Sequence, residues 1–192
     1  MEEKYFAVDL SIALVHHPVL NKHGDIIASA LTNLDLHDIA RSSRTYGIHT
    51  FYVVTPVWEQ QVLAQRIIDH WLDGFGGKYN PHRKEAVELI KVMGSLKAVV
   101  DDIRQRREKH PKMVGTSAKN VPGSIGYDKL KSLLFDGDPY LLLFGTAWGL
   151  SDELICRVDY FLGPISGISG YNHLSVRSAS AIILDRLLGR ND

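Results

Sequence analysis

Two short apolar runs near the C-terminus each lead into a glycine-containing loop, and this pair of features constrains the fold more than any other. Residues 140–144 (YLLLF) precede Gly145, and residues 160–162 (YFL) precede a loop over 163–172 that holds three glycines. A short, continuous apolar run bounded by turn residues is typical of a parallel strand that is buried on both faces. The C-terminal third of the chain is therefore predicted to contain part of a parallel sheet.

The two loops favour a ligand site at one edge of this sheet. Glycine lets a ligand approach the backbone closely, and ligands of parallel α/β sheets bind outside the carboxyl ends of the strands. Ser151 follows the first loop as a candidate helix N-cap, with Asp152 and Glu153 in the first turn. The pattern names no ligand, and an α/β domain whose loops bind nothing is the alternative.

The remaining segments are assigned by hydrophobic period and by turn residues. Further strands are expected at 5–10, 50–55, 88–93 and 112–115, and helices at 32–47, 57–72, 95–109, 127–135 and 174–188. The segments 13–27 and 74–81 are expected to be loops. Strands that alternate with helices predict a single α/β domain over residues 1–192, with a mostly parallel sheet of about six strands flanked by helices on both faces.

The helix expected at 32–47 separates an apolar face from a polar one. At the spacing i, i+3, i+4 and i+7, its small and apolar side chains are Leu36, Ile39, Ala40, Ser43 and Gly47. Asp38, Arg41 and Thr45 lie along the opposite face, which Asp35 and Ser42 flank. The simplest interpretation is a solvated face with an ion pair between Asp38 and Arg41, worth roughly a few tenths of a kcal/mol.

The charge balance argues against a protein that coats nucleic acid by bulk charge. The 192 residues carry 22 Lys and Arg against 22 Asp and Glu, so the formal net charge is zero. Basic residues gather at one expected helix end, as Arg104, Arg106, Arg107, Lys109 and Lys112. This cluster is interpreted either as a solvated helix end, which the helix dipole favours, or as a patch that contacts RNA phosphates.

The histidine and cysteine patterns argue against a metal centre and a disulfide. His16, His17 and His23 match no tight ligand spacing, so no metal is predicted. The single cysteine, Cys156, excludes an internal disulfide and is expected to pack as a small apolar residue. No apolar run reaches membrane-spanning length and the charged start MEEK is unlike a signal peptide, so a cytoplasmic protein without a membrane partner is expected.

Several longer phrases carry a resemblance to a known family. The order strand, FGTAWGL, helix, strand, LGPISGISGYNHLSV, helix resembles the C-terminal half of the SPOUT (α/β-knot) RNA methyltransferase superfamily. The phrases TNLDLHDIARSSRTYG, TSAK and YNHLSVRSA are similar to a bacterial domain related to the tRNA (guanine-N1) methyltransferases. The resemblance implies a deep C-terminal trefoil knot, a cofactor-binding region over about 112–192, S-adenosyl-L-methionine as the cofactor, and methyl transfer to tRNA or rRNA.

The resemblance also implies which residues bind the cofactor. Backbone groups in three loops are expected to hold it, so the glycines matter more than the side chains. Bulky changes at Gly145 or Gly170 are expected to abolish binding and leave the fold intact. The implied positions are Thr116, Ser117, Ala118, Gly145, Thr146, Gly149, Leu162, Pro164, Ile165, Gly170, Asn172, His173 and Leu174.

A further motif implies the catalytic residues. In the ribose-methylating branch the first motif is Asn-x-Gly-x-x-x-Arg, followed six residues later by Gly. DLHDIARSSRTYG places Arg41 on that arginine and Gly47 on that glycine, with Asp35 in place of the asparagine. Arg41 is thus expected to orient the acceptor nucleotide, and Asp38 or Asp35 to accept its proton. Two positions depart from the pattern of this branch: Asp35 stands in place of one asparagine, and Ser175 stands in place of another. The resemblance therefore leaves open whether a base or a ribose is methylated.

The resemblance implies a homodimer, in which the last helix and a helix near the front pack across the twofold axis. Ser178, Ala179, Ala181 and Ile182 suit such packing and equally suit a core face. The site would combine Arg41 of one subunit with the cofactor loops of the other. Two other functions stay open: a SPOUT-fold protein that binds cofactor or RNA without catalysis, and an unrelated α/β nucleotide-binding protein.

Overall fold

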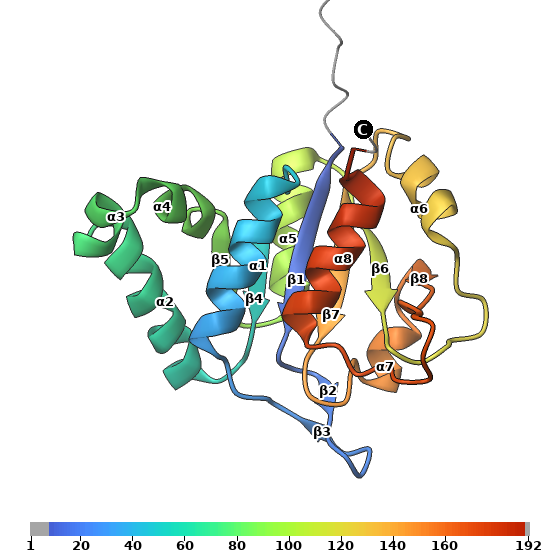
Figure 1. Cartoon of the computed structure of the whole chain (residues 1–192). Coiled ribbons are helices and arrows are strands. Elements are labelled where there is room, and N and C mark those ends of the chain that lie inside the picture. Colours follow the sequence, from blue (N-terminus) through green and yellow to red (C-terminus); the bar gives the residue numbers. More distant parts are fainter. Residues whose placement is uncertain (1–7, 191–192) are drawn as a thin grey trace, which may run out of the picture.

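The computed structural model describes residues 8–190, which form a three-layer α/β domain (Figure 1). Its main sheet has six strands in the order β5-β4-β1-β7-β6-β8, and every neighbouring pair is parallel. The strands are β1 (Leu10–Val15), β4 (Phe51–Val54), β5 (Ile90–Met93), β6 (Lys112–Thr116), β7 (Tyr140–Gly145) and β8 (Tyr160–Leu162). The predicted six-stranded, mostly parallel sheet is confirmed.

The strands β1 and β7 form the centre of the sheet because their sequences place apolar side chains on both faces. Every residue of β1 is buried, and alternate residues enter different layers: Ile12 packs on one face of the sheet and Ala13 on the other. The register pairs Leu10 with Tyr140 and Val15 with Gly145, so the two strands end together. The chain therefore leaves both central strands at the same edge of the sheet.

Helices cover both faces of the sheet. One face carries α1 (Asn33–Thr45), α2 (Trp58–Leu72), α4 (Pro81–Val87), α6 (Tyr127–Leu133) and α8 (Val176–Leu188). The other face carries α5 (Leu96–Arg107) and α7 (Asp152–Ile155). Figure 1 shows α1 and α8 side by side, with α2 and α4 beyond α1 and α6 beyond α8. Within residues 8–190, no helix is both long and apolar enough to cross a membrane.

The first strand lies later than predicted. Residues 5–7 of the expected strand at 5–10 lie outside the described residues, and β1 begins at Leu10 and runs to Val15. The predicted loop at 13–27 is therefore wrong: it starts inside β1 and also contains an antiparallel pair, β2 (Val19–Leu20) and β3 (Ile26–Ile27). A strand buried on both faces shows no alternation of apolar and polar residues, so the sequence gives its ends poorly.

The predicted loop at 74–81 is also wrong, because it contains α3 (Phe75–Tyr79) and the start of α4. Gly76 and Gly77 are buried, and a Cβ added to Gly77 would lie 2.2 Å from the carbonyl oxygen of Trp71. The glycines thus let α3 pack closely against the end of α2. Asn80 caps α4 by accepting from the backbone N–H of Arg83 at 3.0 Å, so the turn directs α4 back toward α1.

The other predicted elements are confirmed, with small differences at their ends. Helix α8 begins at Val176, with Ser175 as its N-cap, and Ser151 caps α7 as predicted. Cys156 is exposed at the end of α7, so its predicted packing as an apolar residue is wrong. Cys156 follows Ile155, the last residue of α7, which packs against the core. The trefoil knot stays a prediction.

Candidate functional site

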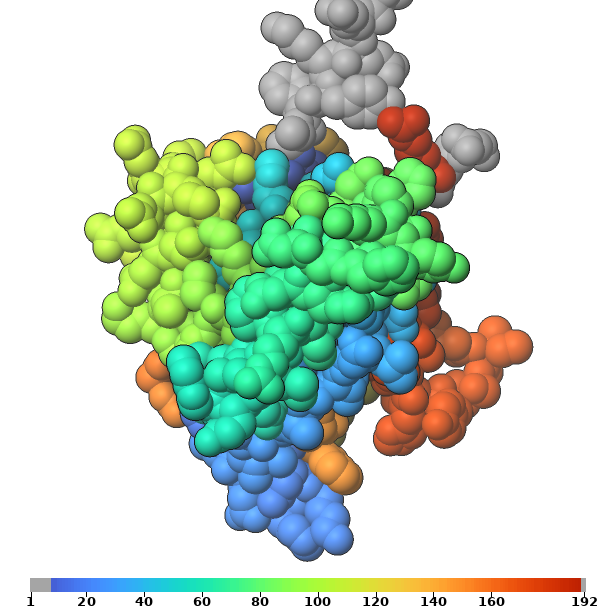
Figure 2. Space-filling model, turned by 90° about the vertical axis from the view of Figure 1, so that its left-hand side faces the viewer, coloured from blue at the N-terminus to red at the C-terminus, as the bar shows by residue number. Residues whose placement is uncertain are grey.

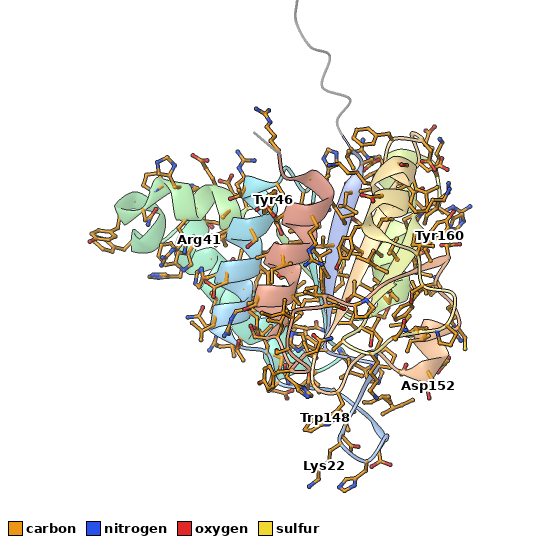
Figure 3. All side chains as sticks on the ribbon, turned by 45° about the vertical axis from the view of Figure 1, so that its right-hand side comes forward. Lys22, Arg41, Tyr46, Trp148, Asp152 and Tyr160 are labelled. Carbon is orange, nitrogen blue, oxygen red and sulfur yellow. The ribbon has the colours of Figure 1, made fainter. Side chains whose placement is uncertain are left out.

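Three loops leave the carboxyl ends of β6, β7 and β8 at one edge of the sheet. They span residues 117–126, 146–151 and 163–175. All the residues predicted to bind a cofactor lie in these loops or at the last position of the strand before them: Thr116 ends β6, Gly145 ends β7 and Leu162 ends β8. Figure 3 shows Trp148 of the second loop beside Lys22 of the β2–β3 connection at this edge.

The first and third loops are held together by hydrogen bonds. Asn172 Nδ2 donates to the carbonyl oxygen of Ala118 at 2.8 Å. Closer to the sheet, the backbone N–H of Ile125 donates to Phe161 at 2.8 Å, and the backbone N–H of Gly163 donates to Ile125 at 3.0 Å. The structure therefore brings together two groups of predicted cofactor residues that lie about 50 positions apart in the sequence.

The loop after β8 leaves apolar side chains and backbone uncovered. Ile168, Tyr171 and Leu174 are exposed, and a Cβ added to Gly170 would meet no atom within 4 Å. The ring of His173 lies edge-on to Tyr171, with the ring centroids 5.4 Å apart. Pro164 and Ile165 are half-buried at the start of the loop. Exposed apolar groups beside free backbone suit a ligand that has both apolar and hydrogen-bonding surface.

Gly145 is tightly packed by the chain that follows it. A Cβ on Gly145 would lie 2.6 Å from the backbone nitrogen of Leu150, because the 146–149 turn folds back over the end of β7. Gly149 completes this turn at φ +107°, a conformation that favours glycine. The side of Gly145 on which a Cβ would lie is therefore filled by the chain itself, and the contact of its backbone with the cofactor stays a prediction.

A buried chain of hydrogen bonds links the ends of β1 and β7. Thr146 Oγ1 donates to the carbonyl oxygen of Val15 at 3.0 Å, so Ser29 Oγ must donate in its 2.5 Å bond to Thr146. Ser29 Oγ then accepts from His16 Nδ1 at 2.9 Å. His16 therefore carries its proton on Nδ1. Its Nε2 is a bare acceptor, buried and without a partner among the described residues.

The environment of His16 keeps the imidazole neutral. Its side chain is fully buried, and burial lowers the pKa of His16 to about 4, although the nearby Asp35 carboxylate acts in the opposite direction. His17 and His23 do not join it in a ligand set. Within residues 8–190, no group of three or more His, Cys, Asp or Glu side chains is placed to hold a metal ion.

The two predicted carboxylate bases differ in their surroundings. Asp35 is buried in the first turn of α1, where it accepts from Thr32 Oγ1 at 2.6 Å and from Arg177 Nη1 at 3.4 Å. Asp38 lies one turn later, is half-exposed, and forms an ion pair with Arg177 Nε at 3.5 Å. The expected ion pair between Asp38 and Arg41 is wrong, because the facing helix α8 supplies the cation.

Arg177 is a site residue that the sequence reasoning did not single out. It stands in the first turn of α8 and bridges both carboxylates of α1, so it fixes the two helices side by side. The phrase YNHLSVRSA already contained it, but only the packing of α8 on α1 shows what it contacts. An arginine hydrogen-bonded or ion-paired to two carboxylates holds them in place.

Arg41 lies on the exposed ridge of α1 between two depressions. No carboxylate lies within 4 Å of its guanidinium in the described part of the chain. One depression, of about 650 Å³, lies between α1 and α8 and is lined by small and polar side chains that include Ser178 and Ala181. The other, of about 510 Å³, lies between α1, α2 and α4. Figure 3 places Arg41 well away from Trp148 at the loop edge of the same chain.

The basic cluster at the end of α5 is largely neutralised. Arg106 pairs with Asp102 at 3.0 Å and Arg107 with Asp9 at 2.9 Å. Farther along, Lys109 and Lys112 pair with aspartates of the 136–138 turn at 2.8–2.9 Å. Lysines and arginines that are ion-paired with carboxylates in this way attract RNA phosphates only weakly. The structure therefore favours the interpretation as a helix end with local ion pairs.

Comparison with known proteins gives a family match. Residues 9–189 match a family described as "SAM-dependent RNA methyltransferase". An uncharacterized protein of Aquifex aeolicus is 44% identical over 181 residues, which cover 94% of this chain and 88% of the relative. A tRNA (guanine-N(1)-)-methyltransferase of Oleidesulfovibrio alaskensis is also 44% identical over 181 residues, which cover 94% of this chain and 42% of the relative. The chain thus spans less than half the length of that named enzyme.

A solved structure supports the fold. A SpoU methyltransferase from Streptomyces viridochromogenes, in complex with the cofactor AdoMet, superposes with a TM-score of 0.53 at 18% identity. The superposition covers 93% of this chain and 56% of that one. At this level of identity the likeness shows a shared α/β architecture.

Proposed function

Because the chain belongs to the family of SAM-dependent RNA methyltransferases, we propose that it methylates a nucleotide of tRNA or rRNA and binds its cofactor on the three loops after β6, β7 and β8. The observation that carries this assignment of the site is the hydrogen bond from Asn172 to Ala118, which joins the first and third loops. The named activity of the Oleidesulfovibrio alaskensis enzyme belongs to a protein of which this chain matches 42%, so the target nucleotide does not follow from it.

The loops fit a cofactor that is part nucleoside and part amino acid. Exposed Ile168, Tyr171 and Leu174 offer apolar surface, and the backbone around Gly170 is open to a ligand. The residues that would hold the cofactor are those of the segments 116–118 and 162–174, with Thr146 and Gly149 from the middle loop. When bound, the sulfonium supplies a methyl group with a good leaving group attached. The chain has only to position the acceptor, remove its proton and disperse charge.

The residues on α1 are proposed to act on the acceptor nucleotide. Arg41 has no carboxylate within 4 Å of its guanidinium among residues 8–190, and it orients the acceptor through its phosphate or base. Asp38 is half-exposed, whereas Asp35 is buried with two donors already on its oxygens. Of the two carboxylates, Asp38 is thus better placed to take the proton as the methyl group arrives. Arg177 holds both carboxylates in position.

The site is proposed to be completed by a second copy of the chain. The core face of α8 is formed by Ser180, Ile183, Leu184 and Leu187, which leaves Ser178 and Ala181 lining the open groove against α1. Small side chains on the α8 side of this groove suit close packing of helices across a twofold axis. Such a dimer would bring Arg41 of one protomer to the cofactor loops of its partner, since the two lie apart within one chain (Figure 3).

Two measurements test the proposal. Methyl transfer from labelled cofactor to total RNA is expected with the wild-type protein, and calorimetry should show that S-adenosylhomocysteine competes with the cofactor. Binding without transfer to any RNA would instead support a protein that holds the cofactor without catalysis. Light scattering should show a dimer, and Ala181→Glu should shift it toward the monomer and remove activity while each chain keeps its cofactor loops.

A further inference from the structure

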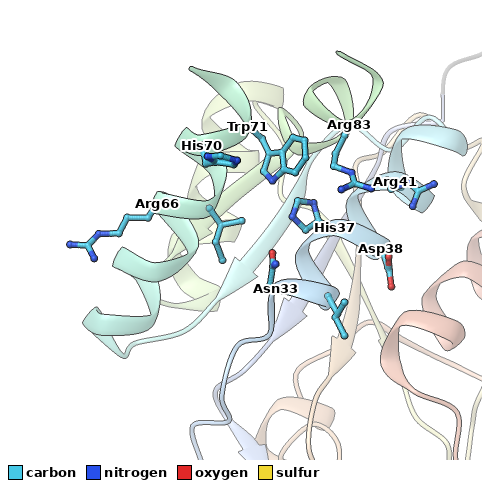
Figure 4. Close-up of a pocket in the computed structure, with 10 residues that line it drawn as sticks. Asn33, His37, Asp38, Arg41, Arg66, His70, Trp71 and Arg83 are labelled. Atoms are coloured by element: carbon cyan, nitrogen blue, oxygen red, sulfur yellow. The ribbon is translucent and has the colours of Figure 1, made fainter. Parts of the chain in front are cut away.

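A pocket outside the proposed cofactor site lies between α1, α2 and α4. It has a volume of about 510 Å³, and we refer to it as the Trp71 pocket (Figure 4). Figure 2 views the face of the molecule that α2, α3 and α4 form, with α1 beside them. The pocket is lined by Asn33, Leu34, His37, Asp38, Arg41, Arg66, Ile67, His70, Trp71 and Arg83. It lies on the far side of α1 from α8 and the cofactor loops (Figure 1).

Three arginines surround this pocket without carboxylate partners. In Figure 4 Arg83 points between Trp71 and His37, and Arg66 and Arg41 stand at opposite rims. Within residues 8–190, none of the three guanidinium groups has a carboxylate within 4 Å. By contrast, Arg44 at the next turn of α1 pairs with Glu85 of α4 at 3.8 Å. The single acidic residue of the lining, Asp38, is paired with Arg177.

The interior of the pocket holds polar atoms without partners. Arg83 Nε and His37 Nδ1 are buried, and neither has a hydrogen-bond partner in the described chain. Arg83 is fixed over the ring of Trp71, 4.9 Å from its centroid, and His37 and His70 meet the same ring edge-on. Burial, and then the positive charge of Arg83, lower the pKa of His37. An anion between these groups would supply the missing acceptor and offset the positive charge.

Apart from Asn33, the rest of the lining is apolar. Leu34 is exposed, and Ile67 and Trp71 are half-buried on the floor between α1 and α2. A ligand that is wholly anionic would leave this floor uncovered. A nucleotide has both parts: its phosphate suits a planar guanidinium held in place, and its ribose and base suit apolar and aromatic surface.

We propose that the Trp71 pocket binds a phosphate-bearing nucleotide of the RNA substrate, at a position other than the one that is methylated. This proposal rests on the proposed function for the statement that the ligand is RNA. It does not depend on the methyl-transfer reaction. Arg83 and Arg66 contact the phosphate, and Leu34, Ile67 and Trp71 pack against the sugar and base. Contacts of this kind fix the register of the RNA on the enzyme and read no base edges.

The test compares matched charge removals on the two faces of the sheet. Arg66→Gln, Arg83→Gln and the double variant remove charge from the pocket. Arg104→Gln removes the same charge from exposed α5 on the opposite face. Affinity for bulk tRNA is measured at several salt concentrations, and affinity for S-adenosylmethionine by calorimetry. The double variant should bind tRNA about tenfold more weakly, with the salt slope reduced by about 1 to 2, while cofactor affinity stays unchanged.

Arg104→Gln should match the wild type in its affinity for tRNA, in the salt slope of that affinity and in its affinity for S-adenosylmethionine. Equal tRNA affinity for the double variant and the Arg104 control would overturn the proposal, as would a wild-type protein that binds no tRNA. If Arg83→Gln does not fold, the exposed Arg66→Gln decides the question alone. If the wild-type protein binds tRNA through these arginines but transfers no methyl group, the proposed function would be refuted. The assignment of the Trp71 pocket to RNA binding would still hold.

Three competitors distinguish which kind of molecule supplies the anionic group that the Trp71 pocket binds. Inorganic phosphate, AMP and polyglutamate are each titrated against labelled tRNA. AMP is expected to compete better than inorganic phosphate, because only AMP covers the apolar floor, and both should need far higher concentrations than unlabelled tRNA. Binding of AMP as tight as that of tRNA would assign the pocket to a free nucleotide, and stronger competition by polyglutamate would assign it to an acidic peptide. Either result would overturn the assignment to RNA.

Discussion

Asn172, on the loop after β8, donates a 2.8 Å hydrogen bond to the carbonyl oxygen of Ala118 on the loop after β6. The substitution Asn172→Asp keeps the shape of the side chain and removes the donor. A lost hydrogen bond of about 1 kcal/mol predicts roughly three- to tenfold weaker binding of S-adenosylmethionine, with little change in Tm. Calorimetry of the cofactor measures this directly. Asn120→Asp adds the same charge at an exposed position of the first loop and is the control; equal affinities for the two variants would place the cofactor elsewhere.

Gly145 and Gly170 should respond differently to the addition of one methyl group. Gly145→Ala would force a Cβ to within 2.6 Å of the Leu150 nitrogen, so it should destabilise the fold by about 1–3 kcal/mol. The Cβ of Gly170→Ala would meet no atom within 4 Å, so this variant should have the same free energy of unfolding as the wild type. Urea unfolding monitored by circular dichroism distinguishes the two. A Gly145→Ala protein of wild-type stability would contradict the packing of the 146–149 turn.

A larger side chain at Gly170 tests the site itself. Gly170→Val should fold normally and lose affinity for S-adenosylmethionine, because its side chain would occupy the open space that the ligand needs. The earlier expectation that a change at Gly145 leaves the fold intact does not agree with the structure. Binding by Gly170→Val as tight as that of the wild type would remove this part of the loop from the site.

Most strands of the sheet and its longer helices were predictable because they depend on local patterns, whereas α3 and α4 were missed. The run YLLLFG and the cap at Ser151 identify β7 and α7 without any knowledge of their neighbours. The placement of the cofactor residues at the strand ends followed from the parallel sheet in the same way. The ends of β1 were less predictable, since a strand buried on both faces carries no alternation.

The partners of the charged residues were not predictable, because they come from distant segments. Arg107 pairs with Asp9, and Arg177 pairs with Asp35 and Asp38 across about 140 positions of sequence. The Trp71 pocket likewise requires α4 to fold back on α1, which depends on the close packing of α3 at Gly77. A sequence read segment by segment gives the charges and leaves open which of them are neutralised.

Acid should destabilise the protein through His16. Well above pH 6.5 His16 is neutral in both states, so it adds no pH dependence there. As the pH falls from 6.5 to about 4, the unfolded chain binds a proton that the folded chain does not, so stability falls with pH. The loss should reach about 3 kcal/mol near pH 4. Urea unfolding at pH 7 and pH 4 measures it.

His16→Asn separates this effect from that of other groups. The amide places a donor near the position of Nδ1, so the bond to Ser29 is kept, but it takes up no proton in this range. The variant should therefore lose less stability than the wild type between pH 7 and pH 4. His37 and His49, whose pKa values are also lowered by burial, remain in both proteins and cancel in the comparison. Parallel losses in the two proteins would show that His16 is not the group responsible.

The last prediction concerns the proton acceptor on α1. Asp38 is half-exposed and held by Arg177 at 3.5 Å, whereas the buried Asp35 already accepts from Thr32 and Arg177. Asp38→Asn should therefore slow turnover by a factor of about 100 to 10,000, the usual cost of losing a positioned base, and leave cofactor affinity nearly unchanged. Asp35→Asn should act mainly through stability, because Arg177 loses a charged partner at a buried position.

Single-turnover methylation with saturating cofactor distinguishes these roles once a substrate RNA is found. Arg41→Ala should weaken RNA binding as well as turnover, since Arg41 is proposed to orient the acceptor. Wild-type rates for both Asp35→Asn and Asp38→Asn would mean that neither carboxylate accepts the proton. In that case Arg177 and its two aspartates would serve only to hold α8 against α1.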